Sequence, residues 1–443
     1  MVCTWTANGQ EDQSRYGENG YMRIKKGMVL DHRYHVISKL GWGEFATVWL
    51  AWDQESLRKR LTSCTSQFVA IKVSKCAEHV GNAAKEEANL LKYIGKNGRG
   101  SGMASLATVL DVFNQKGDYG NHVCMVFPVL GQNILCLVEQ AHRHRSMSRG
   151  LPSLTATAKR PAEDVSFVKS CLRASLRACN ELSRLNIVHT DLKPENILLT
   201  TVSQKTRETM REWQDAVAKL RGTPWEPERL VPTNEHSIDV EKEHSYIRVS
   251  DFGLSSLLDP EAKAHGIGTH ARRLQTKRKG YATNPLGVIL QTREYRAPEV
   301  LFGNPITPTA DVWSIGCMAY ELVTGTFLMD PKKDPKKRTK PEDEINMDHI
   351  CMMQQIIGPV PAHVAKMGGK HLPKYFTDDG RFYQQEKADK YFPPRNLKHE
   401  LCVFLTDNDS DMLCNFVNQC LGSFDTTARA TAEEMLKHPF LSR

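Results

Sequence analysis

The sequence lacks long apolar runs. None of its 443 residues belongs to a stretch of eighteen apolar residues, the length that a bilayer-spanning helix needs. The opening segment, MVCTWTANGQEDQSRYGENG, also lacks the apolar core of a secretory signal. The composition, 40% hydrophobic and 25% charged, is that of a soluble globular protein. We therefore expect an intracellular protein with no membrane partner.

Paired cysteines are missing too. The chain has 12 cysteines, but they are scattered and none forms a C-x-x-C pair. Most stand in apolar surroundings, as Cys124, Cys171 and Cys317 do. This pattern argues against a disulfide framework and favours reduced thiols in a hydrophobic core.

Aromatic residues do not accompany the positive charge. The net charge is +8, and the basic surplus lies in three separate runs at 142–149, 272–279 and 332–340. Base stacking on single-stranded nucleic acid requires aromatic side chains among the basic ones, and these runs contain none. We expect no direct nucleic-acid binding. Solvated faces of insertions explain the runs best, with import signals or partner contacts as the alternative.

Two regions differ in their periodicity. Runs of β-branched and aromatic residues predict strands at 34–43, 47–53, 68–74, 106–114 and 122–127, interrupted by one helix over 79–95 that closes at Gly95. Beyond Leu130 helices dominate, including one near 163–185 and one over 311–325 that ends at Gly325. The expected fold class is α+β, with a small antiparallel β-rich N-lobe (about 31–130) and a large α-helical C-lobe (about 131–443).

Polar or basic segments interrupt this plan. We assign residues 1–20 to a disordered tail, residues 21–443 to one domain, and four insertions to about 141–161, 201–245, 255–287 and 331–346. The second insertion begins with a helical stripe of Met210, Trp213, Val217 and Leu220. Packing of this helix against its own domain is the expected role, and docking of another protein is the alternative.

The first chemical landmarks lie in the strand-rich half. In GWGEFATV (41–48), Gly41 and Gly43 let the backbone approach a phosphate chain closely. Lys72, on the strand VAIK, supplies a cation for phosphates. Glu87 on the following helix is the expected ion-pair partner of Lys72, with Glu86 as the alternative.

A second group lies in IVHTDLKPENILL (187–199). Asp191 can accept a hydroxyl proton, Lys193 can neutralise charge on a transferring phosphoryl group, and Asn196 can hold a metal ion. Asp251 in VSDFG is the main candidate ligand for Mg²⁺. These groups suit phosphoryl transfer, because catalysis of that reaction is mostly positioning and electrostatics.

The order of these motifs, followed by YRAPE (295–299), DVWSIG (311–316) and ARATAEEMLKHPFL (428–441), resembles the eukaryotic protein kinase family over about residues 31–441. The resemblance implies the bilobal kinase fold, ATP and Mg²⁺ as cofactors, and an ion pair between Arg429 and Glu299. It assigns Asp191, Lys193 and Asn196 to catalysis and Asn196 and Asp251 to the metal. The implied ATP-binding residues are Leu40, Gly41, Trp42, Gly43, Glu44, Phe45, Ala46, Thr47, Val48, Ala70, Lys72, Glu87, Phe127, Pro128 and Leu130.

The hinge for adenine is expected after the strand that ends at Phe127. This phenylalanine resembles the family's gatekeeper, a residue at the back of the adenine site. Pro128 has no N–H, but its carbonyl can accept a hydrogen bond from an adenine amino group, and the Leu130 N–H can donate to the ring. Ala46 stands where the third loop glycine of the family often lies.

Within the kinases, RYHVISKLGWGEFATVWLAWD and HTDLKPENIL resemble the SR-protein kinases (SRPK), which phosphorylate serine in Arg/Ser-rich splicing factors. RVSDFG, YRAPEV and HICMMQQIIGPVP resemble the Clk/LAMMER kinases, the alternative family. The SRPK resemblance implies a monomer found in cytoplasm and nucleus. Thr190 replaces the arginine that most kinases use to bind an activation-loop phosphate, so we expect activity without that phosphorylation.

Arg/Ser-rich substrates are cationic, and an acidic groove should bind them. Asp348 matches an SRPK docking acid, whereas Thr326 and Gln355 stand where two further acids are expected. Arg293 and Arg296 resemble substrate-loop arginines with an alternative structural role. The rival functions are a kinase of another substrate class, such as a proline-directed one, a nucleic-acid-binding protein and an inactive scaffold with the kinase fold. A scaffold would lack Lys72, Asp191, Asn196 or Asp251, and all four are present.

Overall fold

A computed structural model describes residues 11–57, 67–139, 163–221, 246–258, 290–331, 341–367 and 372–442. The chain divides into two compact units. Unit 1 comprises Met1–Gly98, Ala104–Cys136 and Glu195–Gly253, and unit 2 comprises Arg99–Met103, Leu137–Pro194 and Leu254–Arg443. Each unit is described separately below.

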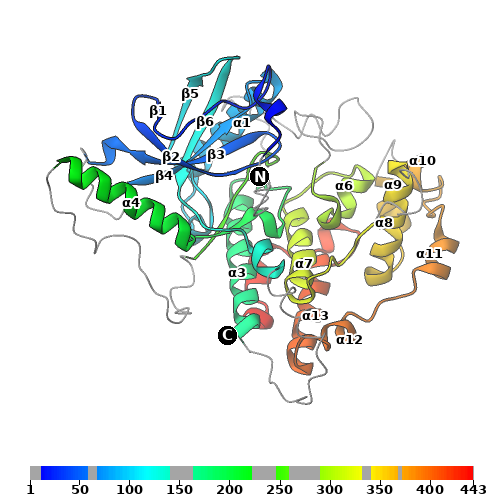
Figure 1. Cartoon of the computed structure of the whole chain (residues 1–443). Coiled ribbons are helices and arrows are strands. Elements are labelled where there is room, and N and C mark those ends of the chain that lie inside the picture. Colours follow the sequence, from blue (N-terminus) through cyan, green and yellow to red (C-terminus); the bar gives the residue numbers. More distant parts are fainter. Residues whose placement is uncertain are drawn as a thin grey trace. The chain divides into compact units, whose positions relative to one another are not determined.

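Unit 1 is built on a six-stranded antiparallel sheet with the strand order β1-β2-β3-β4-β6-β5 (Figure 1). Its strands are β1 (Val29–Leu30), β2 (Tyr34–Trp42), β3 (Ala46–Asp53), β4 (Phe68–Ser74), β5 (Asp111–Lys116) and β6 (Asn121–Pro128). Four of the predicted strands are confirmed. The fifth, 106–114, is wrong in its first half, because Leu106 and Ala107 bond to Val249 and the strand begins only at Asp111.

One face of this sheet is a continuous hydrophobic layer. Val36, Ile71 and Cys124 are fully buried within it.

Helix α1 (Glu78–Asn97) runs past Gly95, which was expected to end it, and closes where the Gly98 N–H bonds to the Ile94 carbonyl at 2.8 Å. A single internal glycine costs a helix only about 1 kcal/mol, so the residues that follow can extend it.

Unit 1 also contains residues from beyond the expected lobe boundary at 130. Strands β8 (Ile197–Leu199) and β9 (Ile247–Val249) pair with each other, and helix α4 (Gln204–Arg221) lies against the sheet (Figure 1). Met210 of α4 is buried among sheet residues, and the ring of Trp213 meets that of Trp52 edge-on at 6.3 Å. This confirms that the first helix of the second insertion packs on its own domain.

Trp213→Ala should lower the free energy of unfolding by roughly 2 kcal/mol, less than for a fully buried tryptophan because Trp213 is only half-buried. The loss comes from contacts between α4 and the sheet. Thermal melting of the full-length protein measures it, with Arg211→Ala on the exposed face of the same helix as the control. Equal melting temperatures for the two variants would mean that α4 contributes no packing energy.

The segment before the sheet needs a correction. Residues 1–10 lie outside the described part, but residues 11–20, which were assigned to the disordered tail, include a short 3-10 helix, η1 (Gln13–Tyr16). Asp12 caps this helix through the Ser14 N–H at 2.9 Å, and Tyr16 is buried. An aromatic side chain in this polar segment therefore finds a core to pack against, which composition alone does not reveal.

Unit 2 is helical. Helix α7 (Thr309–Thr324) forms its centre, with every residue from Ala310 to Thr324 buried, and it ends at Gly325 with φ 71° as predicted. Helices α3 (Glu163–Arg184) and α13 (Asp407–Leu421) pack against it. The described part of unit 2 also contains α6 (Pro298–Phe302), α8 (Glu342–Ile357), α9 (Ala362–Met367), α10 (Leu372–Tyr375), α11 (Gln385–Tyr391), α12 (Leu397–Leu401) and α14 (Ala432–Leu436).

Two further contacts organise unit 2. Short strands β7 (Ile187–Val188) and β10 (Ser256–Leu257) pair with each other, and the segment that carries Asp191 follows β7 in the chain. The expected ion pair between Arg429 and Glu299 is present, with N–O distances of 2.7 and 2.9 Å and neither side chain exposed. A β-rich unit 1 and a helical unit 2 confirm the expected fold class.

The structure describes only part of the predicted insertions. The insertion at 141–161 lies outside the described residues, as do most of those at 255–287 and 331–346 and the second half of 201–245. The ten described cysteines are free, and burial raises the pKa of the Cys171 and Cys317 thiols. Within the described ranges, no helix combines the length and apolarity that a membrane span requires.

Candidate active site

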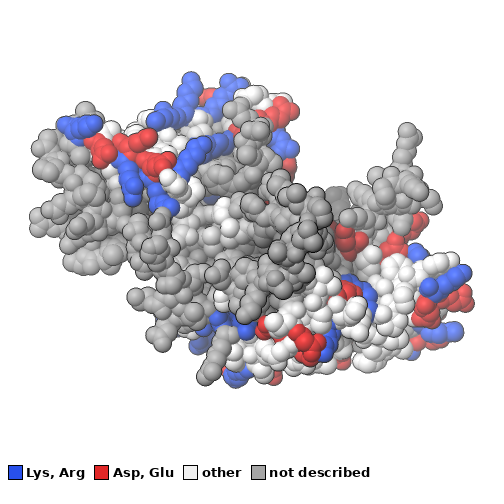
Figure 2. Space-filling model, turned by 60° about the horizontal axis from the view of Figure 1, so that its bottom comes forward, with Lys and Arg blue, Asp and Glu red and all other residues white. Residues whose placement is uncertain are grey.

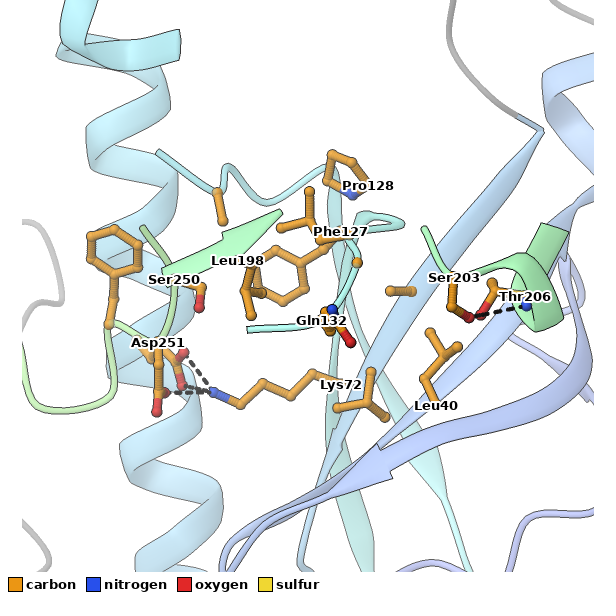
Figure 3. Close-up of a pocket in the computed structure, with 17 residues that line it drawn as sticks. Leu40, Lys72, Phe127, Pro128, Gln132, Leu198, Ser203, Thr206, Ser250 and Asp251 are labelled. Atoms are coloured by element: carbon orange, nitrogen blue, oxygen red, sulfur yellow. Dashed lines mark hydrogen bonds and ion pairs between the residues drawn. The ribbon is translucent and has the colours of Figure 1, made fainter. Parts of the chain in front are cut away.

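A pocket in unit 1 gathers residues from the sheet, from α1 and from the segments around β8 and β9 (Figure 3). Nine of the predicted ATP and metal residues line it: Leu40, Val48, Ala70, Lys72, Glu87, Phe127, Pro128, Leu130 and Asp251. These residues are up to 211 positions apart in the sequence (251 − 40). Folding therefore brings the separate motifs to one place.

Three charged side chains occupy one end of the pocket. The Lys72 ammonium lies 2.7 and 2.8 Å from the two oxygens of Glu87 and 3.4 Å from Asp251 (Figure 3). Lys72 projects from β4 and Glu87 from α1, where it is buried. Glu87 and not Glu86 is thus the partner, because it lies on the face of α1 that packs on the sheet.

Asp251 has an unusual backbone conformation. Its φ is 66°, in the left-handed region that non-glycine residues rarely adopt. Such strain is maintained only where surrounding contacts enforce it, and it concentrates at functional sites. The next residue, Phe252, is buried and lines the pocket, which anchors the chain beside Asp251. The geometry therefore holds the Asp251 carboxylate against Lys72.

Apolar side chains form much of the remaining pocket wall. Ala70 and Phe127 are direct cross-strand neighbours on β4 and β6, and Val48 and Leu198 complete the walls. Apolar walls suit an adenine ring. Triphosphate oxygens suit the Lys72 end, since that end carries the cation. The residues present thus fit ATP.

The predicted glycine-rich loop joins β2 to β3. The Gly43 N–H bonds to the Ala46 carbonyl at 2.8 Å, which closes the turn. The residues that line the pocket do not include the seven predicted loop residues, which are Gly41, Trp42, Gly43, Glu44, Phe45, Ala46 and Thr47. Contact between their main chain and phosphates therefore stays a prediction.

Thr47 points away from the pocket. Its side chain is fully buried and its hydroxyl accepts a hydrogen bond from the Trp49 indole at 3.0 Å. Successive residues of a strand face opposite sides, so Val48 lining the pocket places Thr47 on the other face. The Thr47 hydroxyl is thus occupied by the Trp49 indole, and binding of ATP by Thr47 stays a prediction that could involve only its main chain.

Some pocket residues escaped the sequence-based prediction. They are Ala107, Gly131, Gln132, Leu198, Ser203, Thr206, Ser250 and Phe252. Ser203 and Thr206 come from the start of α4, where the Ser203 hydroxyl accepts the Thr206 N–H at 3.2 Å (Figure 3). A serine before a helical stripe signals a helix start, but no local pattern shows that this start lies at a pocket.

Asp191 belongs to a compact cluster in unit 2. Its carboxylate accepts a hydrogen bond from the Thr292 hydroxyl at 2.7 Å and lies 3.0 Å from the Lys193 ammonium. Lys193 also donates to Thr292 at 2.8 Å. Burial acts to raise the pKa of Asp191, but the Lys193 charge and the Thr292 hydrogen bond outweigh it, so the pKa lies below its ordinary value. Asp191 is therefore ionised at neutral pH.

The backbone before Asp191 is fixed by Asp311 of α7. Its carboxylate accepts the N–H groups of His189 and Thr190 at 2.7 and 2.9 Å. Thr190 has φ 61°, and its hydroxyl donates to the Leu254 carbonyl at 2.6 Å. These contacts preorganise the segment that presents Asp191.

Asn196 is fully buried in unit 1, in a 3-10 turn (Pro194–Asn196). Its carbonyl accepts hydrogen bonds from the N–H and hydroxyl of Ser250, the residue before Asp251, at 2.9 and 3.0 Å. Among the described residues no group of three or more His, Cys, Asp or Glu forms a metal cage. A carboxylate and an amide oxygen nevertheless fit Mg²⁺, which completes its shell with phosphates and water in such sites.

Comparison with known proteins agrees with this geometry. Residues 34–441 match the protein kinase domain family. The chain is 30% identical over 437 residues to the "Serine/threonine-protein kinase SRPK" of Physarum polycephalum, an alignment that covers 98% of this chain and 91% of that protein. The chain belongs to the SRPK family of protein kinases.

Two further relatives are also named as protein kinases. This SRPK-family kinase is 28% identical to "Protein kinase dsk1" of Schizosaccharomyces pombe over 509 positions, covering 98% of this chain and 85% of that protein. It is 27% identical to "Serine/threonine-protein kinase spk-1" of Caenorhabditis elegans over 546 positions, and there it spans 50% of the relative's length.

Proposed function

We propose that this SRPK-family kinase transfers the γ-phosphoryl group of ATP to serine in Arg/Ser-rich proteins that act in splicing or RNA processing. The observation that carries the transferase activity is the Lys72 ammonium, held by Glu87 and Asp251 in a pocket with apolar walls. Support for the substrate class comes from family membership and from the SRPK name of the 30%-identical relative.

In the proposed mechanism each residue has one task. Lys72 orients the phosphates, and Glu87 fixes Lys72. Asp251 and Asn196 would hold Mg²⁺, which would supply positive charge to neutralise the phosphates. The ionised Asp191 accepts the proton of the serine hydroxyl as the oxygen attacks, and Lys193 stabilises the charge that develops on the transferred group. The proposal requires Asp191 of unit 2 to act on a nucleotide held by unit 1.

We also propose that this activity does not need activation-loop phosphorylation. The described end of that segment is held by hydrogen bonds within unit 2. The Gln291 N–H bonds to the Thr190 carbonyl at 3.0 Å, and the buried Gln291 amide bonds to the Ala310 carbonyl and the Ala297 N–H at 3.1 and 2.8 Å. Thr190 offers no charge to a phosphate.

The substrate-loop arginines support the same view. Arg296 is buried and donates to the Leu290 and Gln291 carbonyls at 3.2 and 3.0 Å. Arg293 bonds to Asn346 at 2.9 Å and pairs with Glu342. Both side chains thus secure the segment. These contacts favour a structural role for the two arginines over contact with the substrate.

A single assay tests the reaction and its substrate class. The protein is incubated with radiolabelled ATP, Mg²⁺ and a peptide array that compares Arg-Ser repeats with Ser-Pro peptides, before and after phosphatase treatment. We expect labelling of Arg-Ser peptides that survives the treatment. Preference for Ser-Pro peptides would contradict the substrate class, and loss of nearly all turnover after treatment would contradict the phosphorylation independence.

The proposed docking acid, Asp348, is already paired within the protein. Asp348 on α8 is ion-paired with Lys387 of α11 at 2.6 Å, and only 11% of its side chain is exposed. On the face that Figure 2 draws, acidic and basic side chains of the described residues are interspersed. A cationic substrate would therefore have to displace Lys387 to reach Asp348.

This arrangement gives a directional prediction. Lys387→Met should strengthen binding of an Arg-Ser peptide about two- to fivefold, because it frees the Asp348 carboxylate from a partly exposed ion pair. Asp348→Asn should abolish that gain. Peptide affinity is measured by fluorescence anisotropy, with Lys390→Met on the same helix as the control. An equal gain in Lys390→Met would show that only net charge matters.

We further propose that the protein acts as a monomer in the cytoplasm and nucleus. The localisation is supported by the SRPK family and by the basic runs of the sequence, and the monomeric state by the family alone. Expression of a fluorescent fusion and light scattering of the purified protein test them.

A further inference from the structure

The N-terminal segment 11–21, named the strap below, is attached to unit 1 next to the glycine-rich loop. Its main chain is folded by bonds from the Gly20 and Tyr21 N–H groups to the Gly17 and Arg15 carbonyls, at 3.0 and 2.8 Å. The Gly20 carbonyl accepts the Cys76 N–H at 3.0 Å, which ties the strap to the residues after β4.

Gly20 is required by the space at this point. A Cβ atom at this position would lie 2.1 Å from the Arg15 carbonyl oxygen, which no side chain can tolerate. Tyr16 and Tyr21 meet edge-on at 5.5 Å, and 1% of Tyr21 is exposed. The strap is therefore a specific packed turn and not a chain that merely lies on the surface.

Tyr21 contacts the tip of the glycine-rich loop directly. Its hydroxyl donates to the Gly43 carbonyl at 2.6 Å and accepts from Arg15 at 3.3 Å. Arg15 also pairs with Glu44 at 2.9 Å, and Lys75 lies 3.3 Å from the same carboxylate. A phenol and two cations thus hold two consecutive residues of the loop.

The direction of these contacts matters for phosphate binding. A trans peptide group is planar, so its carbonyl and the following N–H point in opposite directions. Fixing the Gly43 carbonyl toward Tyr21 turns the Glu44 N–H away from the strap. The Phe45 carbonyl likewise accepts the Lys75 N–H at 2.9 Å, which turns the Ala46 N–H away from Lys75. Loop N–H groups of this kind bind phosphate oxygens in kinases.

The charge arrangement has a second effect. Glu44 is an acid at the tip of a loop that covers a polyanion in the proposed reaction, and an uncompensated carboxylate there would repel the phosphates. Partial burial opposes ionisation, but the charges of Lys75 and Arg15 outweigh it and lower the pKa of Glu44. The two cations therefore favour the ionised form of this acid and offset its field.

We propose that the strap holds the glycine-rich loop in its phosphate-binding conformation, and that Tyr21 and Arg15 are positioning residues for the triphosphate of ATP. This inference rests on the proposed binding of ATP in the unit 1 pocket. Because the strap acts on the loop and not on the apolar walls, it affects binding of the triphosphate and leaves binding of the nucleoside unchanged.

Tyr21→Phe in the full-length protein tests the proposal. The variant keeps the buried ring and removes only the hydroxyl that reaches Gly43. We expect the Kd for ATP to rise about three- to tenfold, the effect of one lost hydrogen bond, with an unchanged Kd for adenosine. The KM for ATP should rise while the KM for a peptide substrate stays the same. Amide hydrogens of residues 43–46 should exchange faster.

Tyr34→Phe is the matched control. Tyr34 is as buried as Tyr21 and lies in the same unit, but its hydroxyl donates to Asp111 at 2.7 Å and not to the loop. It should alter melting temperature without altering the ratio of ATP to adenosine affinity. A second variant, Arg15→Met, changes a half-exposed side chain and should raise the ATP Kd about twofold at low salt only.

The outcomes separate the two proposals. A wild-type protein that binds no ATP would refute the proposed function, and the role of the strap with it. If the wild type binds ATP, two results with Tyr21→Phe would overturn this inference: an equal change in the affinities for ATP and adenosine, or no change in either. The strap would then only stabilise the fold. Should Tyr21→Phe fail to fold, Arg15→Met decides: an unchanged ATP Kd at low salt overturns it.

Discussion

Asp191→Asn should lower kcat by about three orders of magnitude, within the range that a positioned general base contributes, while ATP binds as tightly as before. The amide has the shape of the carboxylate, and Thr292 can still donate to its oxygen. It cannot take the proton of a serine hydroxyl, however. Lys193 also loses the negative partner 3.0 Å away, although it keeps Thr292.

Two measurements check this prediction. Transfer of radiolabelled phosphate gives kcat, and calorimetric titration gives the Kd for ATP. Asp379→Asn, which changes an exposed carboxylate of the same unit, is the control for loss of charge. A variant that retains wild-type turnover would refute the assignment of Asp191 as the base.

The depressed pKa of Asp191 adds a pH dependence with a definite sign. Because the folded protein holds this carboxyl ionised more strongly than the unfolded chain, its contribution to stability is present above the unfolded pKa. That contribution is lost as the pH falls through the folded pKa. The ordinary pKa of Asp is about 3.9, so any loss of stability or turnover that protonation of Asp191 causes occurs below about pH 4. A loss of turnover near neutral pH would belong to another group.

The sequence identifies the motifs of the candidate site because each motif carries its own chemical signature. Lys72, Asp191 and Asp251 stand in short patterns whose order along the chain is itself informative. The helix that carries Glu87 is amphipathic, and the side chain on its buried face is the one that reaches Lys72. Local pattern and long-range contact agree at these positions.

Other features depend on contacts that no local pattern encodes. Whether Thr47 faces the pocket depends on strand register and on the Trp49 indole. Ser203 reaches the pocket only because Met210 and Trp213 fix α4 on the sheet. The order of the strap rests on Tyr21, whose partner Gly43 lies 22 positions further along the chain. A polar, charged sequence gives no sign of such a partner, so composition favours disorder there.

The second large effect concerns Lys72. Lys72→Met should reduce kcat/KM by about 10²- to 10³-fold, the range for loss of one electrostatic contact to the transition state. It should also lower stability on the order of 3 kcal/mol, because the buried Glu87 carboxylate loses its cation. A low activity in this single variant therefore has two causes, lost phosphate alignment and a weakened unit 1.

A double variant separates these causes. Lys72→Met with Glu87→Gln removes the unpaired charge, so thermal melting should recover most of the lost stability. The rate of phosphate transfer should stay as low as in the single variant, because no cation remains to orient the phosphates. Glu87→Gln alone should keep the ammonium near Asp251, at 3.4 Å in the wild type, and lose less activity. If the double variant regained turnover together with stability, Lys72 would be a structural residue whose only task is to neutralise Glu87.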